Sequence, residues 1–251
     1  MKVIDALSYV GKSVYFKREF KVEDLIERMN MNGIVMAVIT APPPGPDYTE
    51  ANKIVYEAVK KYPESLIGFY KMNPWFGKEE LERAKSAIKE WNFKGLKLDP
   101  KDDGYNVNDP IVTPVMKLAE ELEIPIFFQS GDSDFCPPEK VVLLAISFPN
   151  VTVMMQHGGS DIVTLLATHP LLCDRTRNLV LGTHPLRGSG PDGADRSLKN
   201  LPKALERNIV FTSEMPFGYP ELELKIIELT NLNKEIKELV LRENIRRILK
   251  I

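Results

Sequence analysis

The sequence predicts a single (β/α)8 TIM barrel of the α/β class that spans residues 1–251. Eight apolar, β-branched runs alternate with eight segments of helical periodicity, and no stretch has the composition of a linker. Each run is almost continuously apolar, which is typical of strands covered on both faces in a parallel sheet. The length of 251 residues also suits such a barrel, which commonly takes about 250. A doubly wound open sheet is the alternative, although no glycine-rich nucleotide motif follows any run.

The expected strands follow one another at fairly regular intervals from the N-terminus. They are residues 2–6, 33–40, 66–72, 93–98, 124–129, 151–156, 178–183 and 208–213. The amphipathic segments between them predict helices, and several open with residues that favour a helix start, such as Thr49 and the pair Asp109-Pro110. The expected helices are 22–30, 49–61, 78–90, 110–121, 138–147, 161–168, 198–207 and 221–229.

The composition predicts an ordinary soluble globular protein. The chain is 43% hydrophobic and 27% charged, and its net charge of −2 offers no basis for binding nucleic acid or an anionic membrane surface. No apolar run approaches the roughly 20 residues that cross a bilayer, and Asp5 interrupts any signal-peptide pattern. Cys136 and Cys173 are too few for a disulfide framework, so we expect a cytoplasmic location. Lys- and Glu-rich segments such as 78–90 are typical of thermophilic proteins. A homodimer is left open.

Two residues after the expected strands are the candidate catalytic groups, because active sites in this fold lie at the C-terminal ends of the strands. His157 follows the sixth run, and an imidazole with an ordinary pKa of about 6.5 can act as a general acid or base. Glu214 follows the eighth run and could orient His157 or act as a base itself. The alternatives are a hydrogen-bonded structural histidine and a rim salt bridge between Glu214 and Lys97.

Other polar residues at the same end are candidates for substrate binding. Lys97 and Asp99 lie two apart at the end of the fourth run and would point the same way. An inward Lys97 could bind a substrate carboxylate or form a Schiff base if desolvated, although a structural role is also open. The Gly-rich segment 183–200 is either a mobile lid with an anion clamp or a plain insertion. The remaining candidates are Tyr9, Gln129, His184 and Arg187, with Arg196 as a further anion-binding group.

Six stretches of the sequence resemble conserved blocks of the amidohydrolase-related family typified by aminocarboxymuconate-semialdehyde decarboxylase. They occur in the family's order from residue 4 to residue 249, which makes the set more specific than any single block. The stretches are "IDALSYVG" (4–11), "GLKLDP" (95–100), "IPIFFQSG" (124–131), "NVTVMMQHGG" (150–159), "NIVFTSEMPFG" (208–218) and "ELVLRENIRRIL" (238–249). The resemblance implies a TIM barrel, and it matches His157 to a sixth-strand histidine that handles protons.

The chain departs from this family at the metal site that the resemblance implies. The family usually holds a metal with two histidines on strand one, a histidine on strand five and an aspartate on strand eight. The matching residues here are Leu7, Tyr9, Gln129 and Glu214. Leu7 has no donor atom, Tyr9 binds a metal only as a phenolate, and Gln129 offers a neutral amide oxygen. Since a catalytic zinc normally takes three protein ligands, we expect no metal and no other cofactor.

Three hypotheses of function follow from these residues. The first is a hydrolase or lyase that acts on a small carboxylated or lactone substrate without a metal, with His157 and Glu214 as acid and base. The second is a non-catalytic barrel that binds a metabolite or a protein. The third is a metal-dependent hydrolase with rearranged ligands, namely His157, His184 and Glu214.

Overall fold

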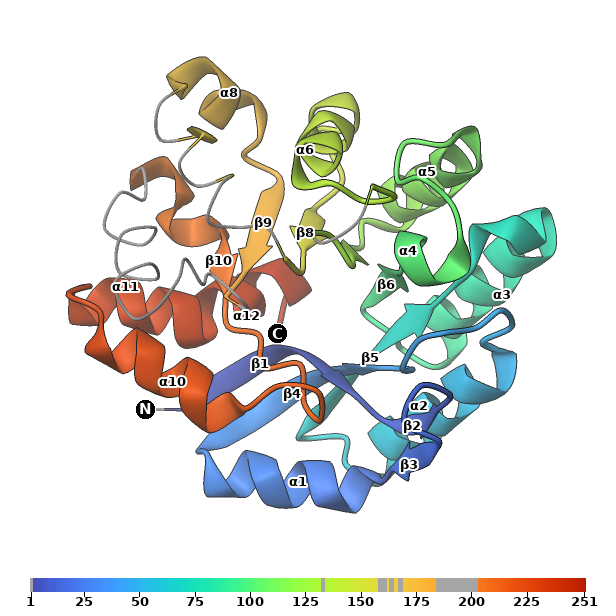
Figure 1. The fold of residues 1–251 in the computed structure, drawn as a ribbon, viewed down its shortest axis with the longest axis horizontal. Helices are drawn as coiled ribbons and strands as arrows, with labels where there is room; N and C mark the ends of the chain where they lie inside the picture. The colour runs from blue at the N-terminus through green and yellow to red at the C-terminus, as the bar shows by residue number, and fades with distance from the viewer. Residues whose placement is uncertain (1, 132–133, 158–161, 163–164, 167–168, 184–202) are drawn as a thin grey trace.

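The computed structural model describes residues 2–131, 134–157, 162, 165–166, 169–183 and 203–251, and these form a TIM barrel. Eight parallel strands follow the order β1-β4-β5-β6-β7-β8-β9-β10, with helices around the outside (Figure 1). The last strand segment returns to the first, because the Ala6 N–H donates to the Phe211 carbonyl at 2.8 Å and the Glu214 N–H donates to the Leu7 carbonyl at 2.9 Å. The predicted fold class is therefore confirmed.

All eight predicted strands are present, each overlapping its expected range. They are β1 (Val3–Tyr9), β4 (Ile34–Thr40), β5 (Leu66–Lys71), β6 (Gly95–Leu98), β7 (Ile126–Phe128), β8 (Val153–Met155), β9 (Leu179–Gly182) and β10 (Ile209–Val210). An antiparallel hairpin of β2 (Gly11–Ser13) and β3 (Arg18–Phe20) was not expected. Its three-residue strands are too short to show the hydrophobic periodicity that identified the others.

Most of the expected helices are also present. They are α1 (Val22–Met31), α2 (Thr49–Lys61), α3 (Gly77–Glu90), α5 (Thr113–Leu122) after the turn η2 (Pro110–Val112), α6 (Pro138–Ser147) and α10 (Pro220–Leu229). Short elements complete the described chain: η1 (Pro74–Phe76), α4 (Pro100–Asp103), α8 (Pro170–Arg175), η3 (Lys203–Asn208), α11 (Lys234–Glu238), the π-helical turn η4 (Leu239–Glu243) and α12 (Asn244–Leu249). The expected helix 161–168 falls largely outside the described residues, and the described second half of the expected helix 198–207 is the 3-10 helix η3. Within the described part of the chain, every helix is too short or too polar to cross a membrane.

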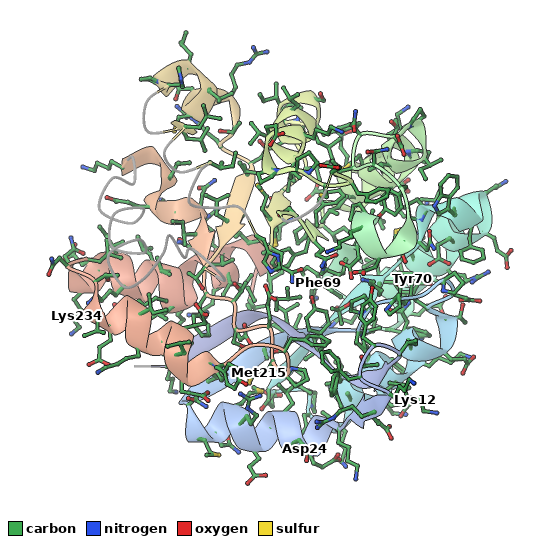
Figure 2. The ribbon with its side chains drawn as sticks, in the orientation of Figure 1. Lys12, Asp24, Phe69, Tyr70, Met215 and Lys234 are labelled. Carbon is green, nitrogen blue, oxygen red and sulfur yellow. The ribbon has the colours of Figure 1, made fainter. Side chains whose placement is uncertain are left out.

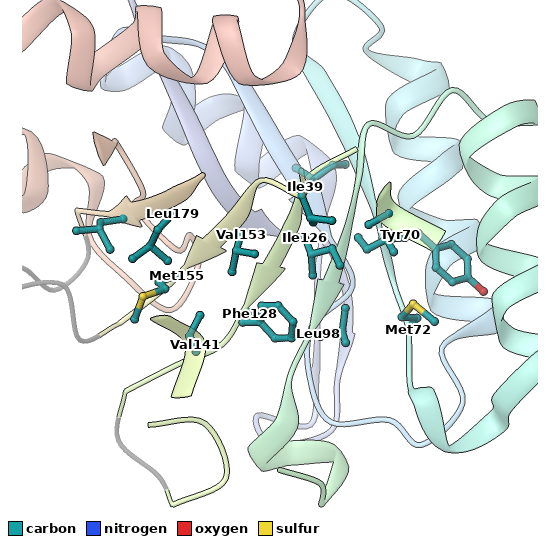
Figure 3. Packing of buried hydrophobic residues seen from close by; sticks show 14 of the residues in the cluster. Ile39, Tyr70, Met72, Leu98, Ile126, Phe128, Val141, Val153, Met155 and Leu179 are labelled. Carbon is teal, nitrogen blue, oxygen red and sulfur yellow. The ribbon is translucent and has the colours of Figure 1, made fainter. Parts of the chain in front are cut away.

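Side chains of alternate strand residues fill two separate cores. One core lies between the strands and the helices, where Ile39, Leu98, Ile126 and Val153 pack on neighbouring strands (Figure 3). The other lies inside the barrel and includes the fully buried Phe69, which is labelled near the middle of the molecule in Figure 2. The inner core is apolar at its floor, with residues that include Leu7, Val38, Ile67, Phe69, Phe127, Met154 and Val180.

The next inward position on each of several strands carries a polar side chain. Strand residues alternate between the two faces, so the residue two positions beyond an inward apolar residue also points inward. This rule places a polar layer over the apolar floor, formed by Thr40, Lys71, Lys97, Gln129 and Gln156 with Tyr9 of β1. Barrel interiors are normally filled by branched apolar residues, and active sites lie at the C-terminal ends of the strands. The polar layer therefore marks the candidate site.

Candidate active site

His157 and Glu214 form a hydrogen-bonded pair at the C-terminal end of the barrel. His157 lies just beyond β8 and Glu214 just beyond β10, and the His157 Nε2 atom is 2.9 Å from Glu214 Oε1. The His157 side chain is 18% exposed and that of Glu214 is 7% exposed. The structure thus brings the two expected catalytic residues into contact, with the imidazole within reach of solvent and the carboxylate behind it.

Glu214 is held in place through its backbone and its neighbour. Its φ of 56° lies in the left-handed region, which costs a residue with a Cβ about 1 kcal/mol or more. Ser213, the residue before Glu214, is held by Asp5. Its N–H donates to Asp5 Oδ1 at 2.9 Å, and its hydroxyl donates to Asp5 Oδ2 at 2.5 Å. Asp5 is fully buried on β1, and burial raises its pKa to about 6 despite its hydrogen bonds. Such over-determined strain is typical of functional positions.

Ser130 and Gly131 hold His157 from the neighbouring strand end, beyond β7. The Ser130 hydroxyl donates to the His157 carbonyl at 2.7 Å and accepts from the His157 N–H at 3.2 Å. Gly131 has a φ of 114°, and a Cβ added there would lie only 2.5 Å from the Cβ of His157. Only glycine allows this close approach of the two segments, so Gly131 is part of what positions the histidine.

Two further expected residues, Tyr9 and Gln129, line the same end of the barrel. The Tyr9 hydroxyl donates to Gln156 Oε1 at 3.4 Å. Burial raises the pKa of Tyr9 well above its ordinary value, so its phenol stays protonated near neutral pH. Gln129 Oε1 is buried and has no hydrogen-bond partner among the described residues. It is an acceptor available to a ligand.

Lys97 and Asp99 are brought together with a third residue, Lys71, that the sequence reasoning missed. Asp99 accepts from Lys97 through Oδ1 and from Lys71 through Oδ2, and all three side chains are fully buried. The signal for Lys71 was its position on β5, two residues after the inward Phe69. Two lysine side chains that share one carboxylate are unusual in a barrel interior, because each buried charge carries a desolvation cost.

A cavity of about 360 Å³ opens beside Tyr9, between the β2–β3 hairpin, α1 and the segment after β10. Phe217 contacts three aromatic rings in its wall, with ring centroids 5.0 to 5.3 Å apart. Three cations and one acid also line the cavity. The lining residues are Tyr9, Phe16, Arg18, Phe20, Lys21, Asp24, Leu25, Arg28, Met215, Pro216, Phe217 and Tyr219. Aromatic walls with an excess of positive charge suit a small aromatic or unsaturated carboxylate.

The side chains at the family's metal positions do not fit a catalytic metal. Leu7 lies in the apolar floor, the Tyr9 phenol is protonated, and Gln129 offers only a neutral oxygen. Glu214 keeps a carboxylate, which contacts His157. Within the described ranges no three His, Cys, Asp or Glu residues are grouped as metal ligands would be.

Three sequence candidates lie outside the described residues. His184, Arg187 and Arg196 belong to the segment 184–202, as does nearly all of the loop 183–200. The third hypothesis, a metal held by rearranged ligands, therefore rests on two described residues, His157 and Glu214, that contact each other.

Several solved structures share this architecture. A Staphylococcus aureus protein described as an amidohydrolase superposes on this chain with a TM-score of 0.80 at 15% identity, and the superposition covers 100% of both chains. The 5-carboxyvanillate decarboxylase of Novosphingobium aromaticivorans, solved with manganese and 4-hydroxy-3-methoxy-5-nitrobenzoic acid, gives a TM-score of 0.78 at 14% identity, over 99% of this chain and 96% of that one. The 4-oxalomesaconate hydratase of Rhodopseudomonas palustris gives 0.70 at 17% identity, over 99% and 95%. At these identities the likeness establishes the fold.

The family follows from the sequence itself. None of the curated proteins compared with the chain matches it. The model of the amidohydrolase family, however, matches residues 21–251, which is nearly the whole chain. This match agrees with the order of the conserved blocks and with the closed barrel. The chain therefore belongs to the amidohydrolase family.

Proposed function

We propose that the chain is an enzyme with hydrolase or lyase activity on a small carboxylated or lactone substrate, and that it works without a metal at the family's usual position. The observation that carries this proposal is the 2.9 Å contact between His157 Nε2 and Glu214 Oε1 at the mouth of the barrel. An imidazole next to a carboxylate is an arrangement that proteins use for proton transfer.

In this pair His157 would transfer the proton, and Glu214 would orient the His157 ring and stabilise its charged form. The Glu214 carboxylate sets the tautomer and orientation of the His157 ring and stabilises the imidazolium that forms when the ring takes a proton. His157 would take that proton from an attacking water or from the substrate, and would return it to the leaving group or to the product carbon. The burial of Glu214 strengthens its interaction with the ring, since it excludes competing water.

The substrate class is supported by the solved relatives and by the lining of the cavity, which adjoins the pair through Met215, the residue after Glu214. Arg18, Lys21 and Arg28 can bind a carboxylate, while Phe20 and Phe217 can pack against a flat ring or double bond. The relatives named above include a decarboxylase and a hydratase, and their names specify small carboxylated substrates. A small molecule is accordingly the partner that we propose for this site.

The test is a screen for turnover with chelator-treated protein. A panel of aromatic carboxylates, unsaturated oxo acids and lactones is incubated with the wild type, with and without added manganese, and products are followed by NMR. We expect turnover of at least one compound by the chelated wild type. Glu214→Gln should lower it by about 10²- to 10⁴-fold, the usual contribution of acid–base catalysis.

Glu228→Gln, an exposed change on α10, is the matched control and should turn over at the wild-type rate. Turnover that requires manganese would contradict the metal-independent proposal. Failure of the wild type on every compound of the panel would favour the non-catalytic barrel.

A further inference from the structure

The buried Lys71–Asp99–Lys97 cluster combines two amines with one carboxylate inside the barrel. Lys71 and Lys97 are directly opposite each other in the register of β5 and β6. Both donate to Asp99, one to each carboxylate oxygen, and none of the three side chains is exposed. Replacing such a cluster by apolar residues is often neutral or stabilising, so its presence in a core position points to a role beyond stability.

The electrostatic surroundings differ between the two lysines. The Lys71 Nζ lies 5.0 Å from the centre of the Tyr48 ring, and Asp102 and Asp103 favour its charged form. Burial lowers the pKa of Lys71 to about 8. Burial, followed by the neighbouring Lys71 ammonium, lowers the pKa of Lys97 well below its ordinary value.

Acidic groups act on Lys97 in the opposite direction. Asp99 accepts its hydrogen bond, and the Glu214 and Asp102 carboxylates favour its charged form, whereas burial raises the pKa of the Cys136 thiol to about 12 and keeps it neutral. Because burial and the Lys71 charge outweigh these groups, we expect Lys71 to hold the proton and Lys97 to be the neutral amine. A desolvated lysine beside another cation is how proteins prepare an amine nucleophile.

Two unpaired polar atoms on the flanking strands point to a ligand in this layer. Thr40 Oγ1 on β4 and Gln129 Oε1 beyond β7 are buried and have no hydrogen-bond partner among the described residues. Their strands lie next to those that carry Lys71 and Lys97, and strand alternation places all four in the inward layer. Buried polar groups in native proteins nearly always have partners, so these two atoms are available to the polar groups of a bound molecule or of an ordered water.

We propose that Lys97 is a nucleophile that forms an imine with a small carbonyl compound, an activity beyond the acid–base function proposed above. The Lys97 amine would attack the carbonyl carbon while the carbonyl oxygen takes a proton from Lys71. The resulting carbinolamine nitrogen gives a proton to Asp99, and the hydroxyl takes that proton back from Asp99 and leaves as water, so that a protonated imine remains beside the Asp99 carboxylate and Lys71 is left neutral. One amine and one carbonyl thus become one imine and one water, and no oxidant or reductant is consumed.

The β2–β3 hairpin contacts the segment that follows β6 and Asp99. At its tip the exposed Tyr15 donates through its hydroxyl to Asp102, three residues after Asp99. A carbonyl compound would enter when this contact opens. A single exposed hydrogen bond is a weak closure, since water replaces it readily.

The test is reductive trapping of the imine with cyanoborohydride. Pyruvate and propanal are the probes, and adducts are located by peptide mass spectrometry. Pyruvate carries a carboxylate that suits Lys71, and propanal is neutral, so the pair also shows whether the anion matters. With at least one probe, we expect Lys97 to be labelled about ten-fold or more faster than the exposed Lys53 and Lys225, because each unit of lowered pKa raises the neutral fraction of the amine ten-fold.

Two variants separate the amine from its surroundings. Lys97→Arg keeps the positive charge but has no primary amine, and it should lose the adduct while circular dichroism shows the wild-type fold. Lys71→Met removes the neighbouring cation, so the labelling of Lys97 should shift to higher pH. The labelling map of the wild type decides the matter even if a variant does not fold. Labelling of the exposed lysines ahead of Lys97 with both probes, or an unchanged adduct in folded Lys97→Arg, would overturn the proposal.

Discussion

Glu214 and His157 contact each other because neighbouring residues fix the position of each. Glu214 takes a left-handed backbone conformation that Ser213 and Asp5 hold in place. His157 is fixed by Ser130 on one side and by the absence of a side chain at Gly131 on the other. A catalytic pair needs this precision, since a displacement of about 1 Å can cost roughly 100-fold in rate.

Gly131→Ala should displace His157 and weaken its contact with Glu214. The new Cβ would lie 2.5 Å from the His157 Cβ, and Gly131 already has a φ of 114° that alanine adopts poorly. We expect a loss of about 1 to 3 kcal/mol in the free energy of unfolding. The imidazole NMR signal of His157, one of only three histidines, should also shift.

Gly77→Ala is the matched control for this change. Gly77 also has a positive φ, of 57°, but an added Cβ would have no heavy atom within 4 Å. It should cost about 1 kcal/mol and leave the His157 signal where it is. Equal effects of the two substitutions on that signal would show that Gly131 does not position the histidine.

At the residue level the sequence pointed to the proposed catalytic pair but not to the lysine cluster. His157 and Glu214 each follow a long apolar run, so their place at the mouth could be predicted from strand boundaries alone. Lys71 lies near the end of such a run as well, but a single polar residue in the almost continuously apolar run 66–72 does not by itself show which face it occupies. Its inward direction follows only once the direction of Phe69 is known.

Among the elements, the strands and long helices could be predicted and the short pieces could not. β4 and α2 contain enough residues to show a period, whereas the β2–β3 hairpin has two strands of three residues each. The hairpin is held by tertiary contacts, including that of Phe16 with Phe217 and that of Tyr15 with Asp102. Such contacts between distant parts of the chain leave no local pattern in the sequence.

Helix α3 carries a buried carboxyl group whose titration should affect stability. Burial raises the pKa of Glu80 from 4.5 to about 7, against the opposing effects of Arg83 and Tyr70. The folded protein therefore holds this proton more tightly than the unfolded chain does. The stabilisation is complete below about pH 4.5 and is lost as the pH rises through about 7.

Glu80→Gln should remove this part of the pH dependence, because glutamine stays neutral. Between pH 4.5 and 8 the free energy of unfolding of the wild type should fall by about 2 to 3 kcal/mol more than that of the variant. Urea unfolding at several pH values measures it. Glu79→Gln is the control, since Glu79 pairs with the same Arg83 but is exposed. Parallel curves for the wild type and Glu80→Gln would show that Glu80 does not titrate in this range.

For the whole molecule, the barrel of this family is present although Leu7, Tyr9 and Gln129 stand where the resemblance places histidine ligands. Leu7 continues the apolar floor, and the backbone of β1 still pairs with the segment after β10 through the Leu7 carbonyl. The fold depends on backbone pairing and on apolar packing, which tolerate these substitutions. The fold class could therefore be predicted from the sequence, whereas the chemistry of the site depends on a few side chains brought together from distant strands.

Removal of metal ions should leave the stability of the whole molecule unchanged. A metal that binds the native state at 100 times its Kd would add about 2.7 kcal/mol, which raises the Tm by several degrees. We expect the same Tm before and after dialysis against chelator. A drop that added manganese or zinc reverses would support the hypothesis of a metal held by rearranged ligands.

The most direct test of the proposed chemistry is His157→Asn, measured for both activity and stability. Asparagine keeps hydrogen-bonding capacity but cannot exchange a proton near neutral pH. On any compound that the wild type converts, kcat/KM should fall by about 10²- to 10⁴-fold while the Tm changes little. A large drop in Tm with kcat/KM unchanged would instead show that His157 is structural, and it would contradict the catalytic role of the His157–Glu214 pair.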